Sequence, residues 1–314
     1  MRALIVDGVR SVKLTDWPEP QPADGDVRVH VRVAGLCGSD VHAMHGGVPN
    51  LPLPLIMGHE FGGVLDDGTP VVVNPMLSCG ACAACDAGRT HLCPQRRVLG
   101  FRASGGFAER VVLPRRNAVP APGLTPTQAA LVEPVANGVH AWHRAGRPLG
   151  AVAVIGAGAV GMSLLHVLRS RGVREVTVID PVAERRAHAR SAGAAATAER
   201  LEGQFEAVFD AAGTASTRRD AVACTQPGGS VALLGLHDDV LQLPASALVV
   251  GDRTLAGCFA YTEAEFAEAV ELAATLDAPW AQILPFDSAA SAVTQLLAGQ
   301  APAGRIKTLF EISA

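Results

Sequence analysis

The sequence predicts an α/β protein in which an irregular β part precedes a doubly wound parallel sheet. In residues 27–33, β-branched and polar side chains alternate strictly, which is typical of a half-buried strand. Glycine and proline interrupt the first 120 residues, most densely at 18–25 and 46–54. From residue 151 onward, short apolar strands alternate with helical segments. Fully apolar strands in that alternation indicate a parallel sheet covered on both faces.

The remaining elements follow from periodicity and from turn residues. Residues 71–74 and 108–113 are further strands of the β part. Thr125 is the predicted N-cap of a helix, because Pro126 suits the first turn. The predicted parallel-sheet part has strands at 151–155, 175–179, 207–209, 230–234 and 255–259 and helices at 162–171, 183–192 and 217–224. A helix at 266–276 and a strand at 306–312 complete the chain.

Composition narrows the class of protein. The 314 residues suffice for two domains, and 49% hydrophobic with 18% charged residues argues for a large core and against disorder. A net charge of −4 with only two lysines disfavours nucleic acid as a partner. The apolar run of residues 1–7 is too short for a signal peptide, and no apolar stretch reaches membrane-spanning length. We therefore expect a cytoplasmic protein without a membrane partner.

Four cysteines within a short segment form the strongest local signal. Cys79, Cys82, Cys85 and Cys93 have the spacing of a four-thiolate site for Zn²⁺. Disulfides are disfavoured in a reducing compartment, and an iron–sulfur cluster is a minor alternative. Four thiolates leave no open coordination position, so this zinc would be structural.

A second set of ligands is dispersed along the chain. Cys37, His59, Glu60 and Glu133 each have an ordinary interpretation on their own, as a buried thiol, a core imidazole or a surface carboxylate. Together they supply one thiolate, one imidazole and one carboxylate, which leaves a fourth position. Such a set holds zinc while leaving a position for substrate or water.

A glycine motif predicts a dinucleotide site. Gly156, Gly158 and Gly161 follow an apolar strand and open a helix, where they allow a tight turn, close approach of a pyrophosphate and close packing of helix on strand. Asp180 ends the next strand, where a carboxylate binds ribose hydroxyls and repels a 2′-phosphate. The pattern favours NAD over NADP. A helix-capping role for Asp180 is compatible with this, and Arg185 and Arg186 leave room for NADP.

Taken together, these motifs resemble the zinc-containing medium-chain dehydrogenase/reductase superfamily, the alcohol dehydrogenase superfamily. The resemblance covers essentially the whole chain, and the motifs occur in family order. They are Cys37-Gly-Ser-Asp, Gly58-His-Glu-Phe-Gly-Gly, the four-cysteine lobe, Val132-Glu-Pro and the glycine motif. Glu133-Pro134, where other members have a cysteine, resembles the sorbitol (polyol) dehydrogenase branch.

The resemblance implies a domain organisation and a set of site roles. It implies a GroES-like catalytic domain from 1–134 and 279–314, and a Rossmann NAD-binding domain at 135–278. The implied ligands of catalytic zinc are Cys37, His59 and Glu133, with Glu60 as a carboxylate that exchanges with water on the metal. Ser39 would pass the substrate proton through the cofactor ribose to His42, and Lys307 would lie near the pyrophosphate.

The implied activity is hydride transfer between NAD and a secondary alcohol or ketone, such as a polyol, sugar alcohol or (amino)cyclitol. A simple secondary alcohol or a biosynthetic intermediate is the alternative substrate, and a non-catalytic zinc and nucleotide-binding protein is a remote alternative. The edge strand near 255–259 would allow a homodimer or homotetramer. Two segments, 63–71 and 195–207, are shorter than is usual in the family, so loop geometry there is open.

Overall fold

The computed structural model describes residues 1–300, 302 and 304–312. The chain divides into two compact units, Met1–Glu133 with Thr262–Ala314 and Pro134–Tyr261. The sequence predicts the boundaries at 134/135 and 278/279. In the structure the helix α8 (Glu263–Ala273) lies with the first unit. One reason is that Gln128 Nε2 donates hydrogen bonds to the carbonyl oxygens of Ala274 and Leu276.

The first unit is mainly β structure, as the sequence predicts. Its sheets have the strand orders β2-β1-β4, β10-β6-β5-β3-β18-β17 with β9 also on β3, and β7-β8. The strands are β1 (Arg2–Gly8), β2 (Ser11–Asp16), β3 (Asp26–Leu36), β4 (Leu55–Ile56), β5 (Glu60–Leu65), β6 (Pro70–Val73), β7 (Met76–Leu77), β8 (Arg97–Val98), β9 (Arg110–Pro114), β10 (Ala118–Pro120), β17 (Ala281–Pro285) and β18 (Lys307–Glu311).

The long strand β3 organises this unit. Val29, Val31 and Val33 are buried along it while Arg32 is exposed, which confirms the predicted alternation. β18 returns from the far end of the chain to pair antiparallel with β3, Thr308 opposite Leu36. The helices of the unit are α1 (Gly38–Met44), α2 (Ala83–Asp86), α8, α9 (Ala289–Leu297) and the 3₁₀ turns η1 (Thr90–Leu92), η2 (Arg115–Asn117) and η3 (Phe286–Ser288).

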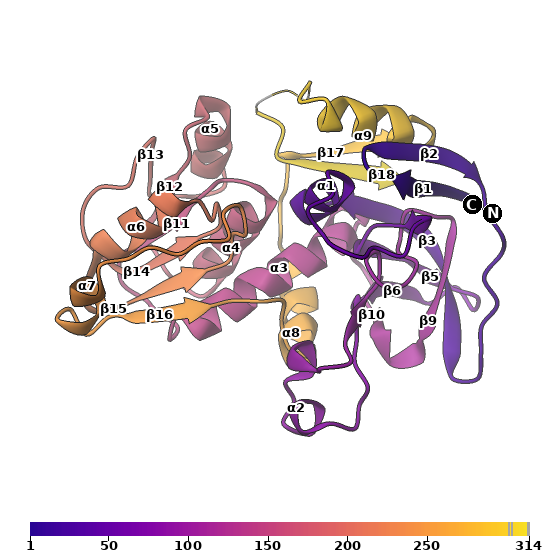
Figure 1. Cartoon of the computed structure of the whole chain (residues 1–314), viewed down its shortest axis with the longest axis horizontal. Coiled ribbons are helices and arrows are strands. Elements are labelled where there is room, and N and C mark those ends of the chain that lie inside the picture. The colour runs from indigo at the N-terminus through magenta and orange to yellow at the C-terminus, as the bar shows by residue number, and fades with distance from the viewer. Residues whose placement is uncertain (301, 303, 313–314) are drawn as a thin grey trace. The chain divides into compact units, whose positions relative to one another are not determined.

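The second unit contains the predicted parallel sheet, drawn in Figure 1 with its strands running side by side. All neighbours pair in parallel in the order β13-β12-β11-β14-β15-β16. Counted from β11, this is the 3-2-1-4-5-6 order of a dinucleotide-binding fold. The strands are β11 (Val152–Ile155), β12 (Val176–Ile179), β13 (Ala196–Ala198), β14 (Phe205–Asp210), β15 (Thr225–Leu233) and β16 (Thr254–Gly257).

Helices cover this sheet as the doubly wound fold requires. α4 packs on β11 and β12, α5 on β12 and β13, and α6 on β14 and β15. They are α4 (Ala159–Ser170), α5 (Ala183–Ser191), α6 (Ala215–Ala223) and α7 (Ala245–Val249). The predicted elements are confirmed with small shifts at their ends. The strand β13 is additional, because Ala-Thr-Ala has a single β-branched residue between two alanines and so lacks a strand pattern.

The helix α3 (Pro126–Arg144) begins in the first unit and ends in the second. It starts at Pro126, and its start has the geometry of a capping box. The backbone N–H of Gln128 donates to Thr125 Oγ1, and the Thr125 N–H donates to Gln128 Oε1. The predicted N-cap is therefore confirmed. Among the described residues, no helix is long and apolar enough to cross a membrane.

Candidate active site

The structure brings three of the four dispersed candidate ligands together. One ligand atom from each of Cys37, His59 and Glu60 lies within 4.8 Å of the others, and His59 and Glu60 are buried. Cys37 follows directly on β3 and precedes α1, whereas Glu60 is the first residue of β5. Because β3 and β5 are neighbours, with Gly35 opposite Glu60, sheet pairing fixes the separation of these residues. One sulfur, one nitrogen and one oxygen donor fit zinc with an open position.

Asp40 holds this group together, a role that the sequence alone did not indicate. Its carboxylate is fully buried. One oxygen accepts the backbone N–H of Cys37 at 3.0 Å, and the other lies 3.2 Å from Nδ1 of His59. A carboxylate on Nδ1 directs Nε2 towards a metal and fixes the ring orientation. The available signal is its place in Cys37-Gly-Ser-Asp, three residues after a candidate ligand.

The same carboxylate shapes the electrostatics of His59. Burial by itself would lower the pKa of the imidazole, but the negative charges of Asp40 and Cys37 outweigh it. Together they hold the pKa of His59 well above its ordinary value. The negative charges around His59 therefore stabilise positive charge. A proton on the imidazole supplies such charge, and a bound divalent cation would supply it as well.

Lys307 is paired with Glu60. Its ammonium donates a hydrogen bond to Glu60 Oε2, and both side chains are about 1% exposed. Gly35 makes this possible, since a Cβ at that position would lie 2.5 Å from Glu60 Oε2. Burial acts to lower the pKa of Lys307, but the Glu60 and Cys37 charges raise it above its ordinary value. The predicted contact of Lys307 with a pyrophosphate stays a prediction.

The two predicted relay residues share the helix α1. Ser39 Oγ lies 3.5 Å from His59 Nε2, so its hydroxyl faces the same space as the ligand atoms. His42 is one helical turn further on and is exposed. Its imidazole lies against Gly47, where a Cβ would come within 2.2 Å of the ring. The helix thus leads from the ligand cluster to the surface.

Glu133 lies on α3 and is not among the three residues grouped above. Its side chain is half-buried. Its role as a metal ligand therefore stays a prediction. The next residue, Pro134, lies inside the helix without ending it.

The four cysteines of the predicted structural site form the second group. Ligand atoms of Cys79, Cys82, Cys85 and Cys93 lie within 4.8 Å of one another. None of them forms a disulfide, and the sulfur separations include 3.5 Å for Cys82–Cys85 and for Cys79–Cys93. Four free thiols that converge on one point provide the donor set of a closed zinc site.

The backbone around this lobe favours thiolates. The Cys79 N–H donates to the sulfur of Cys93 at 3.4 Å, and this bond contributes most to lowering the pKa of Cys93 to about 7. For Cys82, the Cys85 N–H acts in the lowering direction, but burial and the neighbouring thiols raise the pKa to about 11. Zinc binds thiolates, so a bound ion would favour the deprotonated form of all four cysteines.

The glycine motif lies at the end of β11, and its close contacts explain two of its glycines. Gly156 has a φ of +94°, which favours glycine, and turns the chain from β11 towards α4. A Cβ on Gly161 would lie 1.8 Å from the carbonyl oxygen of Gly156. Gly158 is the N-cap of α4, and a Cβ there would have nothing within 4 Å, so its backbone borders open space. A helix N-terminus in this position suits a phosphate group.

A cavity of about 640 Å³ lies at this point within the second unit. Gly156, Gly158 and Asp180 line it, and Arg185 lies on its wall. The Asp180 carboxylate accepts the N–H groups of Ala157 at 2.9 Å and Val182 at 2.8 Å. The second bond closes a turn just before α5, whose N-cap residue is Val182 and which receives no side-chain cap. The helix-capping role considered for Asp180 is therefore not observed, and its carboxylate lines the cavity. The volume and the lining fit a dinucleotide.

Two family profiles match the chain. That of the alcohol dehydrogenase GroES-like domain matches residues 23–123, and that of the zinc-binding dehydrogenases matches residues 159–275. The first lies in the β unit and the second largely in the unit with the parallel sheet. These matches confirm the fold class that the sequence predicts.

Relatives agree with the profiles. The chain is 32% identical to L-galactonate-5-dehydrogenase of Escherichia coli K12 over 81% of its own length and 82% of the relative's. Galactitol-1-phosphate dehydrogenase from Escherichia coli has a similar structure, with a TM-score of 0.90 at 28% identity, covering 100% of each chain. A zinc-binding dehydrogenase from Sinorhizobium meliloti 1021, solved with bound NADP, has a TM-score of 0.90 at 27% identity, covering 99% and 98% of the two chains. The chain therefore belongs to the zinc-containing medium-chain dehydrogenase/reductase superfamily, and it is an oxidoreductase of the alcohol dehydrogenase type.

Proposed function

We propose that this oxidoreductase transfers hydride between NAD and a secondary hydroxyl group of a polyol, sugar alcohol or (amino)cyclitol. The observation that carries the proposal is the open donor group of Cys37, His59 and Glu60, with Asp40 fixing the imidazole. A second zinc in the four-cysteine lobe would stabilise the fold without taking part in the reaction.

The side chains around the open group have separate tasks. Bound zinc would supply a Lewis acid that brings the pKa of a substrate hydroxyl towards neutrality. Cys37 and His59 would hold the ion, with Glu133 as the further ligand expected from the polyol branch. Glu60 would exchange between the ion and Lys307, which neutralises the carboxylate when it is not on the metal.

The proton of the substrate hydroxyl needs a route to water. Ser39 would accept it, because its Oγ faces the ligand cluster 3.5 Å from His59 Nε2. His42 would release it to solvent, because it is exposed and one turn further along the same helix. Substitution of Ser39 by alanine should lower kcat strongly while zinc content stays that of the wild type.

NAD, rather than NADP, is supported by Asp180. NAD would supply the nicotinamide carbon that accepts or gives the hydride. The Asp180 carboxylate uses two acceptor positions on backbone N–H groups and has others left for ribose hydroxyls. The negative charge of Asp180 would repel a 2′-phosphate at the same place. Asp180→Ala should raise KM for NAD⁺ and weaken discrimination against NADP⁺; unchanged cofactor kinetics would contradict this role.

The substrate class rests on the relatives and on the Glu133-Pro134 motif. L-galactonate and galactitol 1-phosphate, the substrates in the names of two similar proteins, are both polyhydroxylated chains. The test is NADH production by the zinc-loaded protein on a panel of polyols, cyclitols and simple secondary alcohols, with Cys37→Ala as the inactive control. Turnover restricted to simple alcohols would overturn the polyol assignment, and no turnover on any member would overturn the enzymatic one.

We also propose that the chain forms a homodimer or homotetramer. Within the residues that the structure describes, β16 is the last strand of the parallel sheet and pairs only with β15, so its outer edge is available to a second copy. Sedimentation of the zinc-loaded protein tests this directly, and a monomer at micromolar concentration would contradict it.

A further inference from the structure

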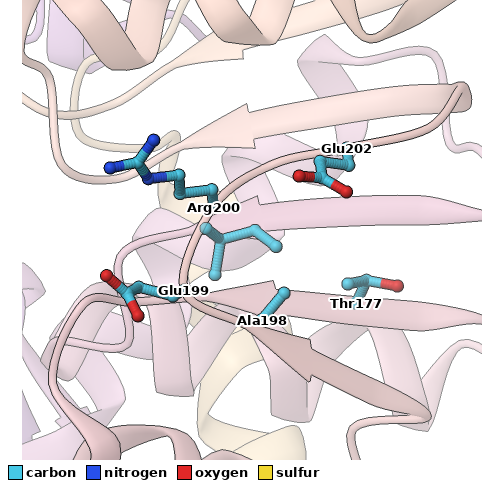
Figure 2. A pocket seen from close by; sticks show the side chains of 6 residues that line it. Thr177, Ala198, Glu199, Arg200 and Glu202 are labelled. Carbon is cyan, nitrogen blue, oxygen red and sulfur yellow. The ribbon is translucent and has the colours of Figure 1, made fainter.

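A second hollow adjoins the dinucleotide cavity. It has a volume of about 400 Å³ and is lined by Thr177, Ile179, Ala198, Glu199, Arg200 and Glu202. Three of these residues, Ile179, Glu199 and Arg200, also line the dinucleotide cavity, so the two spaces meet there. Figure 2 shows the side chains of Arg200 and Glu199 extending to one side of the hollow, with Thr177 and Glu202 on the other side.

The hollow exists because one crossover of the parallel sheet has no helix. α4, α5 and α6 follow β11, β12 and β14, but residues 199–204 alone connect β13 to β14. A crossover between parallel strands is usually built around a helix that covers the sheet. Without one, the sheet face around Thr177 is only partly covered, and that side chain is half-buried.

The shared wall combines apolar side chains with one guanidinium. Ile179, Leu201, Ala211 and Ala212 line the dinucleotide cavity next to Arg200. In the part of the chain that the structure describes, the guanidinium of Arg200 is exposed and makes no hydrogen bond or ion pair. A planar cation beside an apolar slot is a partner for the face of an aromatic ring.

The charges at this place disfavour a phosphate as the ligand of Arg200. Asp180 and Glu199 line the same cavity, and the guanidinium Nη1 of Arg185 lies 4.0 Å from Asp180 Oδ2. A dianionic group between two carboxylates would be repelled, whereas a neutral purine would not. We infer that the guanidinium of Arg200 stacks on the adenine ring of the bound dinucleotide and closes the crevice where the crossover helix is missing.

This inference rests on the proposed binding of a dinucleotide, so its test measures binding rather than turnover. Dissociation constants of NAD⁺, 5′-AMP and 2′,5′-ADP are measured by calorimetry on the zinc-loaded full chain. The variants are Arg200→Gln and Arg200→Lys. Arg219→Gln is the matched control, because Arg219 is exposed on α6 and lines neither cavity.

Stacking predicts one pattern across the three probes. Arg200→Gln should weaken NAD⁺, 5′-AMP and 2′,5′-ADP by a common factor of about three to thirty. Arg200→Lys should give a smaller loss, since the charge stays but the planar group does not, and Arg219→Gln should bind as the wild type does. Equal affinity of wild type and Arg200→Gln for 5′-AMP would overturn the inference.

Two further outcomes would also overturn the inference about Arg200, and the three probes distinguish them. Loss of affinity confined to 2′,5′-ADP would assign Arg200 to a 2′-phosphate instead of the base. Absence of binding of all three probes to the wild type would refute the dinucleotide site itself, and with it the proposed function. Because Arg200 is exposed, the variants are expected to keep the wild-type melting temperature, which is measured alongside.

Discussion

Substituting Gly161 by alanine separates the packing role of the glycine motif from its binding role. The added Cβ would lie 1.8 Å from the carbonyl oxygen of Gly156 and 3.5 Å from Val154 Cγ1. Carbon and oxygen in contact are about 3.3 Å apart, so α4 must retreat from β11 by about 1.5 Å. Gly161 is buried and Gly156 is held at a φ of +94°, so neither side yields easily.

The expected cost is that of an overpacked core, about 1–3 kcal/mol. For a chain of 314 residues, about 2 kcal/mol corresponds to a fall of about 3 °C in Tm. The displaced helix N-terminus should also bind the dinucleotide less tightly.

Gly158→Ala is the matched control, because nothing lies within 4 Å of its Cβ position and its φ is −77°. It should cost less than about 1 kcal/mol in stability, while its methyl group enters the cavity and weakens NAD⁺ binding. Urea denaturation and NAD⁺ titration of both variants test the pair. A Gly161→Ala protein as stable as the wild type, or a Gly158→Ala protein that fails to fold, would refute this reasoning.

Three other predictions concern the metal lobe, the buried ion pair and one buried acid. Cys82→Ser should lose one zinc per chain and unfold at lower temperature, because structural zinc contributes folding free energy; unchanged metal content would count against a closed site. Lys307→Met leaves the Glu60 carboxylate buried without its partner and should cost about 3–5 kcal/mol, measured by urea denaturation, with Lys307→Arg as the charge-conserving control. Burial raises the pKa of Asp210 despite backbone N–H donors and Thr217. The stability from its protonated form is fully present below about pH 3.8 and is lost as pH rises through the raised pKa. Asp210→Asn should therefore gain stability relative to the wild type as pH rises above about 3.8, and a difference in unfolding free energy that does not change with pH would contradict this.

Local sequence patterns predicted much of the fold. The parallel sheet was predictable from apolar strands that alternate with helices, and the N-cap at Thr125 was predictable from Pro126 next to it. β13 and α1 lacked such a signal, since one is alanine-rich and the other opens with Gly38 and has only two turns. Short elements like these form because their neighbours in the fold supply the contacts.

The residues of the candidate site also divide into those that a local sequence pattern predicts and those that it does not. The four cysteines were recognisable because their spacing is short. The pairing of Lys307 with Glu60 depends on β18 lying beside β3, a contact between opposite ends of the chain that no local pattern encodes. The contact of Asp40 with His59 depends likewise on β5 running next to β3.

The zinc content of the wild type and of Cys37→Ala, determined together with NADH production on the polyol panel, tests the central claim most directly. The two donor groups predict about two zinc ions per chain in the active wild type. Cys37→Ala should be folded and inactive and should retain about one. A wild type with one zinc and no turnover, or a Cys37→Ala protein that keeps two zincs and full activity, would contradict the assignment of the open site as the catalytic centre.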